Sequence, residues 1–466
     1  MQADQSTQQS SRVSKEGGPG GRRIPGLMHL FSMGRPMAAA VPLREDQELE
    51  LGREAAALGE VQDPRMSRHH ACVRFDGRRF WVADLGSRNG TYVDGEPVPA
   101  GTPREAQRVI QIGNSLFVPS PDVRPLQEHG VELLDGFVRG PAVRERLGEV
   151  ERAAQLGFLL HIRGESGTGK EGLARAFHNH GRRTGHFVAV NCAAIPQSIA
   201  ESLLFGAKRG AYSGAEADAP GYLQSADGGT LFLDEVAELD QMIQAKLLRV
   251  IEEKEVLPLG APRPRKVDFH LCSASNRDLR ALVASGRLRE DLYFRIGRPE
   301  VTLPPLRERP EEIPLLLERE VRQQAPDLEL HISLVEACLL RPWPGNVREL
   351  LVAVRSALQA ALMQGAHRVE ARHLSPDAGL VFGPGAHPAP PLPGVAPPAG
   401  APSHAKPLDG DERARIEEAL RQQGGNVAAT ARALGMHRTQ LRRLLKRHGI
   451  LSPGSSAQAE PEDEDE

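Results

Sequence analysis

Two short motifs together have the chemistry to bind and hydrolyse a nucleoside triphosphate. The first, Gly164-Glu165-Ser166-Gly167-Thr168-Gly169-Lys170, follows an apolar run at 157–162 that predicts a strand. Glycines at this spacing let backbone N–H groups wrap phosphates, and the lysine neutralises the β and γ oxygens. The second is an apolar run at 230–235 that ends in Asp234 and Glu235. We predict that Asp234 holds Mg²⁺, through water, and that Glu235 polarises the attacking water.

The position after the lysine departs from the general phosphate-loop pattern. A hydroxyl usually follows the lysine and reaches Mg²⁺, but this chain has Glu171 there. How the coordination of Mg²⁺ is completed is therefore open at this point. The predicted ATP-binding residues of the loop are Gly164, Glu165, Ser166, Gly167, Thr168, Gly169, Lys170 and Glu171.

A loop between the two motifs indicates what ATP hydrolysis drives. It comprises Gly210, Ala211, Tyr212, Ser213, Gly214 and Ala215. The order of motifs from the phosphate loop through this loop to Arg348 resembles the central AAA+ domain of bacterial enhancer-binding proteins, which activate sigma-54 RNA polymerase. That family's loop reads GAFTGA, and its resemblance implies that residues 210–215 contact sigma-54. Tyr212 keeps the aromatic ring and adds a hydroxyl, whereas Ser213 keeps the hydroxyl and loses a methyl. Upstream, Ala207 and Lys208 replace a His and a Glu, which alters the electrostatics at the base of the loop.

The resemblance also assigns roles around the γ-phosphate. Glu171 matches the enhancer-binding family's own form of the phosphate loop. Asn191 matches an asparagine that restrains Glu235, and Asn276 matches the polar sensor of the γ-phosphate. Arg348 lies in a segment that resembles the family's lid motif, so it would reach nucleotide bound to its own subunit.

Two arginines imply that hydrolysis requires assembly. Arg289 and Arg295 match the family's pair of fingers, which one subunit supplies to the next subunit's nucleotide. Such an arginine stabilises the charge that develops on the transferred phosphoryl group. The resemblance therefore implies a homo-oligomer, from dimer to hexamer.

Three blocks near the N-terminus could bind a phosphorylated peptide. Segments 52–53, 67–71 and 84–91 resemble the signature blocks of a forkhead-associated (FHA) domain, a β-sandwich that binds phosphothreonine. A phosphothreonine is nearly dianionic and offers several acceptor oxygens. The implied partner is a phosphothreonine protein or a Ser/Thr kinase; the alternative is a degenerate sandwich kept for assembly. The implied phosphothreonine-binding residues are Arg53, Ser67, Arg68, Arg88 and Asn89.

The C-terminal region predicts a DNA-binding module. Residues 411–450 carry nine Lys and Arg against four Asp and Glu, and read as helices at 412–422, 426–434 and 437–448. Gly435 makes the turn between the last two helices, as in a helix-turn-helix. The module resembles the factor-for-inversion-stimulation (Fis) type, which implies dimers on double-stranded DNA upstream of promoters. The implied DNA contacts are Arg438, Thr439, Gln440, Arg442, Arg443 and Lys446.

Length and composition agree with several domains in one chain. A chain of 466 residues exceeds one ordinary core, and 40% hydrophobic with 26% charged residues is typical of globular proteins. Apolar runs are too short to cross a bilayer, and residues 1–23 lack the apolar core of a signal peptide, so we expect a cytoplasmic protein without membrane association. The four cysteines are far apart, which suits neither disulfides nor paired metal ligands.

The predicted fold class is multidomain: an all-β FHA sandwich, an α/β AAA+ P-loop ATPase with an α-helical lid, and an all-α helix-turn-helix. Nine prolines among Ala and Gly at 383–407 predict an extended tether before the last domain. The boundaries are a disordered tail at 1–25, the FHA domain at 26–122, a linker at 123–134, the ATPase at 135–378 with its lid from about 305, a linker at 379–410, the helix-turn-helix at 411–452 and an acidic tail at 453–466.

These predictions converge on a transcription activator that uses ATP hydrolysis by an oligomeric ring to remodel sigma-54 RNA polymerase, with phosphothreonine-dependent input. Its cofactors are ATP and Mg²⁺. Two alternatives stay open. One is a DNA-bound ATP-binding regulator that has lost productive sigma-54 contact, and the other is a phosphothreonine adaptor whose ATP binding drives only oligomerisation.

Overall fold

The computed structural model describes residues 23–381, apart from 56–57, 59–62, 135, 158 and 213–215, and further residues 418–419, 421–423, 429–430 and 433. The chain divides into two units, residues 1–395 and 396–466. Nearly all described residues belong to the first unit, so the fold below is that of the first unit. The acidic tail and most of the predicted 379–410 linker lie outside the described residues.

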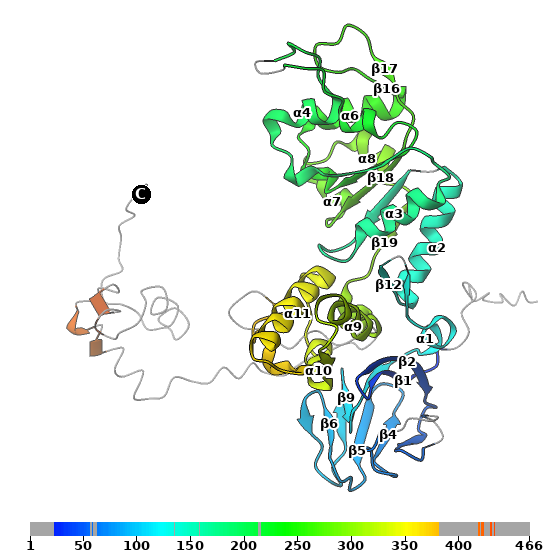
Figure 1. Cartoon of the computed structure of the whole chain (residues 1–466), viewed down its shortest axis with the longest axis vertical. Coiled ribbons are helices and arrows are strands. Elements are labelled where there is room, and N and C mark those ends of the chain that lie inside the picture. The colour runs from blue at the N-terminus through cyan, green and yellow to red at the C-terminus, as the bar shows by residue number, and fades with distance from the viewer. Residues whose placement is uncertain are drawn as a thin grey trace, which may run out of the picture. The chain divides into compact units, whose positions relative to one another are not determined.

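Residues 26–120 form a sandwich of two antiparallel sheets (Figure 1). The strand order is β2-β1-β10-β9-β6-β7 in the larger sheet and β3-β4-β5-β8 in the smaller one. The larger sheet contains β1 (Gly26–Ser32), β2 (Arg35–Pro42), β6 (Thr91–Val93), β7 (Glu96–Pro97), β9 (Ile110–Ile112) and β10 (Ser115–Ser120). The smaller sheet contains β3 (Glu48–Leu51), β4 (Ala71–Phe75), β5 (Phe80–Asp84) and β8 (Arg104–Ala106).

Side-chain alternation explains why these segments form a sandwich. Along β4 and β5, buried and more exposed residues alternate, as expected when one face of a sheet covers a core. Val73 and Val82 pair in register and are fully buried between the sheets, together with Leu27 of β1 and Phe117 of β10. The predicted all-β domain is confirmed.

A short connection joins the sandwich to the ATPase. It contains helix α1 (Arg124–His129) and the hairpin of β11 (Glu132–Leu134) and β12 (Phe137–Arg139). Val123, just before α1, is fully buried, and its N–H donates to the carbonyl of Ile24. The predicted linker at 123–134 therefore packs against the start of the sandwich.

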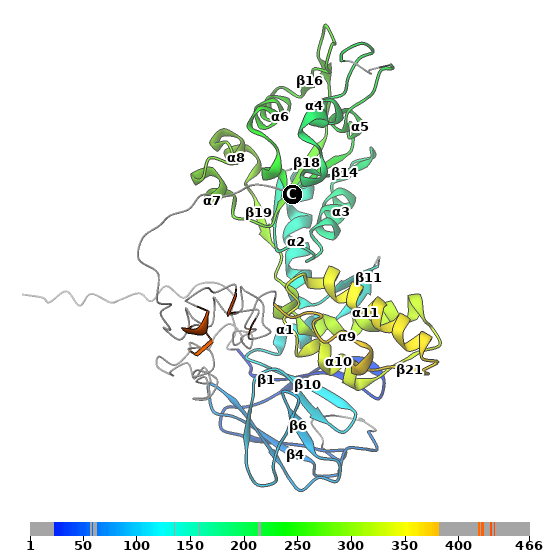
Figure 2. The ribbon, with the colours of Figure 1, turned by 90° about the vertical axis from the view of Figure 1, so that its left-hand side faces the viewer.

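The ATPase is built on a parallel five-stranded sheet with the order β14-β15-β18-β13-β19 (Figure 2). Its strands are β13 (Leu160–Arg163), β14 (Phe187–Asn191), β15 (Thr230–Asp234), β18 (His270–Ser275) and β19 (Glu300–Thr302). Helix α2 (Pro141–Gln155) precedes the first of these strands. Between the strands lie α3 (Lys170–His180), η2 (Cys192–Ala194), α4 (Gln197–Phe205), α5 (Tyr222–Ser225), η3 (Val236–Glu238), α6 (Gln241–Glu253), α7 (Leu279–Ala284) and α8 (Glu290–Ile296). A small hairpin, β16 (Glu255–Val256) with β17 (Arg265–Lys266), follows α6.

Two predicted strand boundaries were wrong. The strand expected at 157–162 begins only at Leu160, because Gly157 has φ +68° and completes the turn out of α2. The strand expected at 230–235 ends at Asp234, because Glu235 has the left-handed φ of +53°. The order and type of elements confirm the predicted α/β fold of this domain.

The lid is helical, as predicted. It contains η4 (Leu306–Glu308), η5 (Pro310–Glu312), α9 (Ile313–Gln324), α10 (Ile332–Leu339), α11 (Asn346–Met363) and η6 (Ala371–His373), with a parallel pair of β20 (Glu329–Leu330) and β21 (Arg368–Val369). Buried residues recur every three or four positions along α11, at Leu350, Val354, Ala357, Leu358 and Ala361. That spacing places one apolar stripe toward the core.

The described part of the chain holds neither a disulfide nor a cluster of metal-ligating side chains. All four cysteines are free thiols. Among the described residues, no group of three or more His, Cys, Asp and Glu side chains is placed to hold a metal ion. No helix within those residues is both long enough and apolar enough to cross a membrane.

Candidate functional site: a nucleotide site with three attached modules

The phosphate loop lies between β13 and α3, at the carboxyl end of the parallel sheet. Gly167 and Gly169 have φ of +77° and +103°, a region that side chains rarely adopt, and a Cβ at Gly167 would lie 2.2 Å from the carbonyl oxygen of Gly345. Lys170 begins α3 and is 7% exposed. Its Nζ donates to the carbonyl of Gly164 at 3.1 Å, so the ammonium is held inside the loop.

The carboxylate of Glu235 lies next to this lysine. Nζ of Lys170 and Oε1 of Glu235 are 3.6 Å apart, and the N–H of Asn276 donates to Oε2 at 3.2 Å. Three separate segments therefore meet here: the start of α3, the end of β15 and the end of β18. Glu235 is held in the left-handed region, which costs a non-glycine residue free energy and is common at functional sites.

The carboxylate of Asp234 has one oxygen engaged within the chain. Its Oδ1 accepts from the N–H of Glu235 at 3.1 Å. Asn191 is the neighbour of Asp234 in the sheet, since the two residues pair in register between β14 and β15. The Asn191 side chain accepts from the N–H of Ala193 at 3.1 Å and so caps η2.

Glu171 points away from the loop. Its Oε1 is 2.7 Å from Nη2 of Arg175, one helical turn along α3, and both side chains are more than half exposed. The structure therefore places this predicted ATP-binding side chain in a surface ion pair.

The lid contacts the phosphate loop from the other side. Nη1 of Arg348 donates to Oγ of Ser166 at 3.1 Å, and its N–H donates to the carbonyl of Gly167 at 3.3 Å. Nδ2 of Asn346 donates to the carbonyl of Ser166 at 3.0 Å and to Oε2 of Glu165 at 3.1 Å. Asn346 is buried and has φ +54°, a value that asparagine tolerates better than most residues.

Two further arginines fix the loop to the lid, and sequence reasoning missed both. Arg307 makes a bidentate pair with Glu165 at 2.7 and 2.9 Å, and this hydrogen bonding lowers the pKa of the Glu165 carboxyl. Arg309 is 1% exposed, bonds Glu312 at 2.9 Å and donates to the carbonyl of Thr168 at 2.6 Å. Their only sequence signal was two arginines directly after Pro304-Pro305-Leu306.

A cavity of about 880 Å³ lies beside the loop. It is bounded by α2, β19 and the segment 303–308, and it reaches Gly164, Glu165 and Asn276. Charges of both signs line it, from Arg146, Arg163, Arg307, Glu149, Glu300 and Glu308. Predicted ATP-binding and sensor residues thus border an open, polar space.

The predicted fingers lie on α8. Arg289 is the N-cap residue and Arg295 lies in the last turn. The guanidinium of Arg289 pairs with Asp291 at 2.7 Å, with both side chains partly exposed. Phe294, between the two arginines in sequence, is 72% exposed, which is unusual for a phenylalanine and typical of an interface.

The predicted sigma-54 loop begins at the end of a structured stem. Ala207 pairs with Ala219 across the loop, and the N–H of Lys208 donates to the carbonyl of Leu259 at 2.9 Å. Lys208 forms an ion pair with Asp218, whose other oxygen accepts from the N–H of Arg209 at 2.9 Å. Gly210 has φ +80°, Ala211 is partly exposed and Tyr212 is 48% exposed, whereas Ser213, Gly214 and Ala215 lie outside the described residues.

The predicted phosphothreonine residues lie on two adjacent loops of the sandwich. Buried His70 joins these loops, because its Nδ1 accepts from the N–H of Ser67 at 2.9 Å and its Nε2 lies 3.1 Å from the carbonyl of Gly90. Oγ of Ser67 accepts from the N–H of Arg88 at 3.1 Å. A Cβ at Gly52 would lie 1.9 Å from the carbonyl of Arg68, so only glycine allows this close approach.

Three exposed arginines surround Ser67: Arg53, Arg68 and Arg88. Arg68 pairs with Glu54 at 3.2 Å, with both side chains more than half exposed. Nδ2 of Asn89 donates to the carbonyl of Arg65 at 2.7 Å, which ties the tip of one loop to the other. The structure thus brings all five predicted residues to one end of the sandwich.

The predicted DNA contacts Arg438, Thr439, Gln440, Arg442, Arg443 and Lys446 lie outside the described residues. Sequence comparison nevertheless covers this region. Residues 411–448 match the model of bacterial regulatory proteins of the Fis family. Residues 49–113 match the FHA domain, 137–302 the sigma-54 interaction domain and 307–379 the AAA+ ATPase lid domain.

Curated relatives agree with these domains. The chain is 41% identical over 323 residues to the nitric oxide reductase transcription regulator NorR2 of Cupriavidus necator, which covers 66% of this chain and 62% of that protein. It is 40% identical over 278 residues to the DNA-binding transcriptional regulator NtrC of a Bradyrhizobium species, covering 58% of this chain and 57% of that protein. The chain therefore spans about 60% of the length of these relatives.

Solved structures include similar chains. NtrX of Brucella abortus in complex with ADP is 30% identical, with 66% of this chain and 68% of that one covered and a TM-score of 0.47. A structure described as phosphothreonine-dependent FHA domain interactions is 31% identical, with 21% of this chain and 94% of that one covered and a TM-score of 0.17. With an FHA domain, a sigma-54 interaction domain, an AAA+ lid and a Fis-type helix-turn-helix in that order, the chain belongs to the family of sigma-54-dependent transcriptional regulators.

Proposed function

We propose that this protein is an ATP-hydrolysing transcription activator that remodels closed complexes of sigma-54 RNA polymerase. The observation that carries the proposal is the meeting of Lys170, Glu235 and Asn276 at the phosphate loop, with Arg348 of the lid on the same loop. Each is a group that phosphoryl transfer needs: a cation, a base, a polar sensor and a second cation.

Hydrolysis would proceed by positioning and by electrostatic stabilisation. The N–H groups of the glycine-rich loop and Lys170 bind the β and γ phosphates, and Arg348 adds charge from the lid. Glu235 is within 3.6 Å of Lys170, so a water beside the γ-phosphate would lie within reach of its carboxylate, which orients the water and accepts its proton. The ammonium of Lys170 then moves from Glu235 to the phosphates when ATP binds.

The residues present fit Mg²⁺ through water. Mg²⁺ keeps several waters and uses one or two carboxylates together with substrate phosphates. Oδ2 of Asp234 would bind the Mg²⁺ through water, because Oδ1 already accepts from the N–H of Glu235. Glu171 would not take this part, because its carboxylate pairs with Arg175. Bound Mg²⁺ would neutralise charge that develops on the phosphates.

Assembly would complete the site. Arg289 and Arg295 lie on α8 with exposed Phe294 between them, which suits contact with a neighbouring subunit. One subunit then supplies the arginines that stabilise the transition state on the next, so an isolated subunit is nearly inactive. We propose a ring, most simply a hexamer.

The remaining modules would supply output and input. The 210–215 loop, raised on the Lys208–Asp218 stem, would contact sigma-54, and the Fis-type module would hold the protein at upstream DNA. Arg53, Ser67, Arg68, Arg88 and Asn89 would bind a phosphothreonine of a partner protein or kinase. A phosphate that accepts several charge-assisted hydrogen bonds from these loops is recognised tightly.

Mixing of two inactive variants tests the assembled ATP site. Lys170→Ala removes phosphate binding but keeps the fingers, whereas Arg289→Ala with Arg295→Ala keeps phosphate binding but lacks the fingers. In a random equal mixture, about a quarter of the interfaces combine an intact phosphate loop from the arginine variant with intact fingers from Lys170→Ala. We therefore expect about a quarter of wild-type ATP turnover from the mixture.

Two outcomes would contradict the proposal. Full turnover by the arginine variant alone would show that no subunit acts on its neighbour. No recovery in a mixture that sedimentation shows to be co-assembled would place the arginines outside the site. The matched control is Arg249→Ala, which removes an exposed arginine that pairs with Glu253 on α6 and should leave turnover unchanged.

A further inference from the structure

The outer face of the FHA sandwich is buried. Every residue of β1 and β10 is buried, although a strand in a free two-layer sandwich leaves one face to solvent. Leu27 and Phe117 point into the sandwich core. Their neighbours point the other way and belong to a second cluster, to which the sandwich contributes Met28, Leu30, Phe31, Leu116 and Val118.

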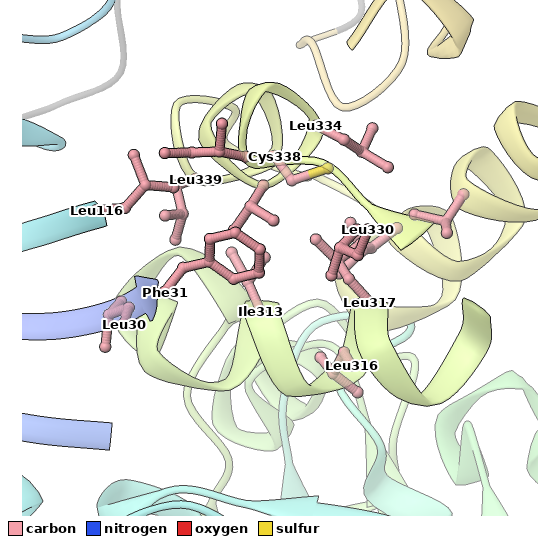
Figure 3. Close-up of a cluster of buried hydrophobic side chains, with 14 of the residues drawn as sticks. Leu30, Phe31, Leu116, Ile313, Leu316, Leu317, Leu330, Leu334, Cys338 and Leu339 are labelled. Carbon is pink, nitrogen blue, oxygen red and sulfur yellow. The ribbon is translucent and has the colours of Figure 1, made fainter. Parts of the chain in front are cut away.

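The lid supplies the other side of this second cluster. Helix α10 packs on β1 and β10, and α9 packs on β2. Both ribbon views show these lid helices next to the sandwich (Figures 1 and 2). A register shift between His29 and Phe31 lets Leu30 and Phe31 both face the lid. Figure 3 shows Phe31 among lid side chains of this cluster, namely Ile313, Leu316, Leu317, Leu330, Leu334, Cys338 and Leu339.

A polar contact fixes the edge of the same interface. The guanidinium of Arg108 donates to the carbonyl of Leu340, the C-cap residue of α10. A cation at this end of a helix satisfies a free carbonyl and interacts favourably with the helix dipole. Asp94 holds the Arg108 segment in place, because its carboxylate accepts from the N–H groups of Arg108 and Val109 at 2.8 and 2.9 Å.

The buried face is linked directly to the phosphothreonine loops. Ser115 begins β10, and its Oγ donates to Oδ2 of Asp63 at 3.2 Å. Asp63 is fully buried, and its Oδ1 accepts from the N–H of Arg65 at 3.0 Å. Arg65 in turn receives the Asn89 hydrogen bond, and Ser67 follows two residues later. These hydrogen bonds connect β10 to the loop that carries Ser67.

The same cluster is linked to the nucleotide site. Helix α11 presents Asn346 and Arg348 to the phosphate loop at its first turn. Farther along this helix, Leu350, Val354 and Leu358 belong to the cluster that contains Phe31 and Leu116. The lid that touches the phosphate loop is thus continuous in packing with the outer face of the FHA sandwich.

We propose that the FHA sandwich and the lid form one cooperative unit, through which phosphothreonine and nucleotide each change the affinity of the other. The identity of the two ligands rests on the proposed function, whereas the shared unit does not. Packed interiors shift between discrete arrangements rather than deforming gradually, so a displaced lid would be felt at the far loops. Such coupling is reciprocal, because each ligand must change the affinity of the other by the same factor. It requires that the two domains behave as one unit, and nucleotide alone is sufficient to test that requirement.

The test follows two domains in one sample of the full chain. Pulsed hydrogen exchange with mass spectrometry, along a urea series, reads β4 and β5 of the sandwich and α11 of the lid. We expect one common unfolding midpoint, and we expect saturating Mg·ADP to raise both midpoints by the same amount. Separate midpoints in wild type would overturn the shared unit.

Variants decide whether the interface carries the effect. Leu116→Asp charges the outer face, so the two midpoints should separate and Mg·ADP should raise only that of α11. If Leu116→Asp does not fold, Arg108→Ala serves as a milder variant of the same interface. It should reduce the shift of the sandwich midpoint that Mg·ADP causes. Arg104→Ala is the control, because Arg104 pairs with Glu96 on the exposed surface of the sandwich and should behave as wild type.

The outcomes separate this inference from the proposed function. If Mg·ADP raises the midpoint of α11 but not that of the sandwich, the nucleotide site stands and the coupling is refuted. If Mg·ADP raises neither midpoint, the proposed nucleotide site is refuted. The shared unit is then still tested without nucleotide, by whether the two domains unfold at one midpoint and whether Leu116→Asp separates their midpoints. An ADP effect on the sandwich that survives Leu116→Asp would also refute the coupling path.

Discussion

Removal of the Arg309 side chain should destabilise the lid and loosen the phosphate loop together. Its guanidinium lies 2.9 Å from Glu312 and donates to the carbonyl of Thr168 at 2.6 Å, while Glu312 also accepts from the N–H of Gly140 at 2.8 Å. One buried cation therefore joins the lid, the phosphate loop and the start of α2. The informative substitution is Arg309→Met, which keeps the length of the side chain and removes its charge.

The magnitude follows from burial. Both side chains of the pair are 1% exposed, so Arg309→Met leaves a buried carboxylate without its countercharge. Breaking a buried ion pair from one side costs about 3–5 kcal/mol of unfolding free energy. With a urea dependence of about 2 kcal/mol per M, the unfolding midpoint should fall by about 2 M.

Fluorescence of Trp343 provides the assay. The chain has two tryptophans, and Trp343 is fully buried in the lid with its Nε1 donating to the carbonyl of Cys338 at 2.7 Å. In a Trp81→Phe background, urea titration of the remaining fluorescence reports lid unfolding. Arg322→Met is the control, since this arginine is 73% exposed in its pair with Glu318 and should change nothing measurable.

A second substitution shows whether buried charge is the cause. Adding Glu312→Gln to Arg309→Met removes the unpaired carboxylate and keeps an acceptor for Gly140, so at least half of the lost midpoint should return. A loss below about 1 kcal/mol for Arg309→Met, or no recovery in the double variant, would refute the reasoning. The affinity for Mg·ATP should fall and recover in parallel.

Three further predictions concern other parts of the molecule. Burial, and next the charge of Glu312, raises the pKa of Glu311 from 4.5 to about 8, so the folded state holds a proton that the unfolded state releases. The free energy of unfolding of the lid should therefore fall as pH rises from about 5 to 8, and it should depend less on pH in Glu311→Gln. Urea unfolding of the Trp81→Phe variant, followed by the fluorescence of Trp343, measures both. Lys208→Glu should reduce promoter opening without changing stability, because the Lys208–Asp218 pair is exposed. Adding Asp218→Lys should restore opening, and no recovery would show that this pair does not support the function of the loop. Arg53→Ala with Ser67→Ala should weaken binding of a phosphothreonine peptide at least about tenfold by calorimetry, and unchanged binding would remove these residues from the site.

The domain order and the two motifs at 164–170 and 230–235 could be predicted from the sequence because their signals are local. The glycines of the phosphate loop require special backbone angles, and the run before Asp234 has the composition of a buried strand. The α-helical lid was expected because the segment around Arg348 resembles the family's lid motif, and the buried residues of α11 recur with the 3.6-residue period of such a helix. Local spacing is sufficient for such features.

Other features depend on contacts that are distant in sequence. Arg307 and Arg309 matter because they meet Glu165 and Thr168, more than one hundred residues earlier. The run Gly26–Ser32 is buried on both faces, but only the packing of α10 against it shows what covers its outer face. Such pairings require the assembled fold. The ion pair between Glu171 and Arg175 differs, because its i,i+4 spacing on α3 is local and could have been read from the sequence.

ATP hydrolysis by this chain is proposed to open sigma-54 promoter complexes. The most direct measurement is ATP-dependent open-complex formation by sigma-54 RNA polymerase, at a promoter with the protein's own upstream site and with its phosphorylated partner supplied. Wild type should open the promoter only with hydrolysable ATP, and Glu235→Gln should bind ATP and DNA without opening. ATP turnover and DNA binding by wild type without any opening would contradict the account and favour a regulator that no longer engages sigma-54 productively.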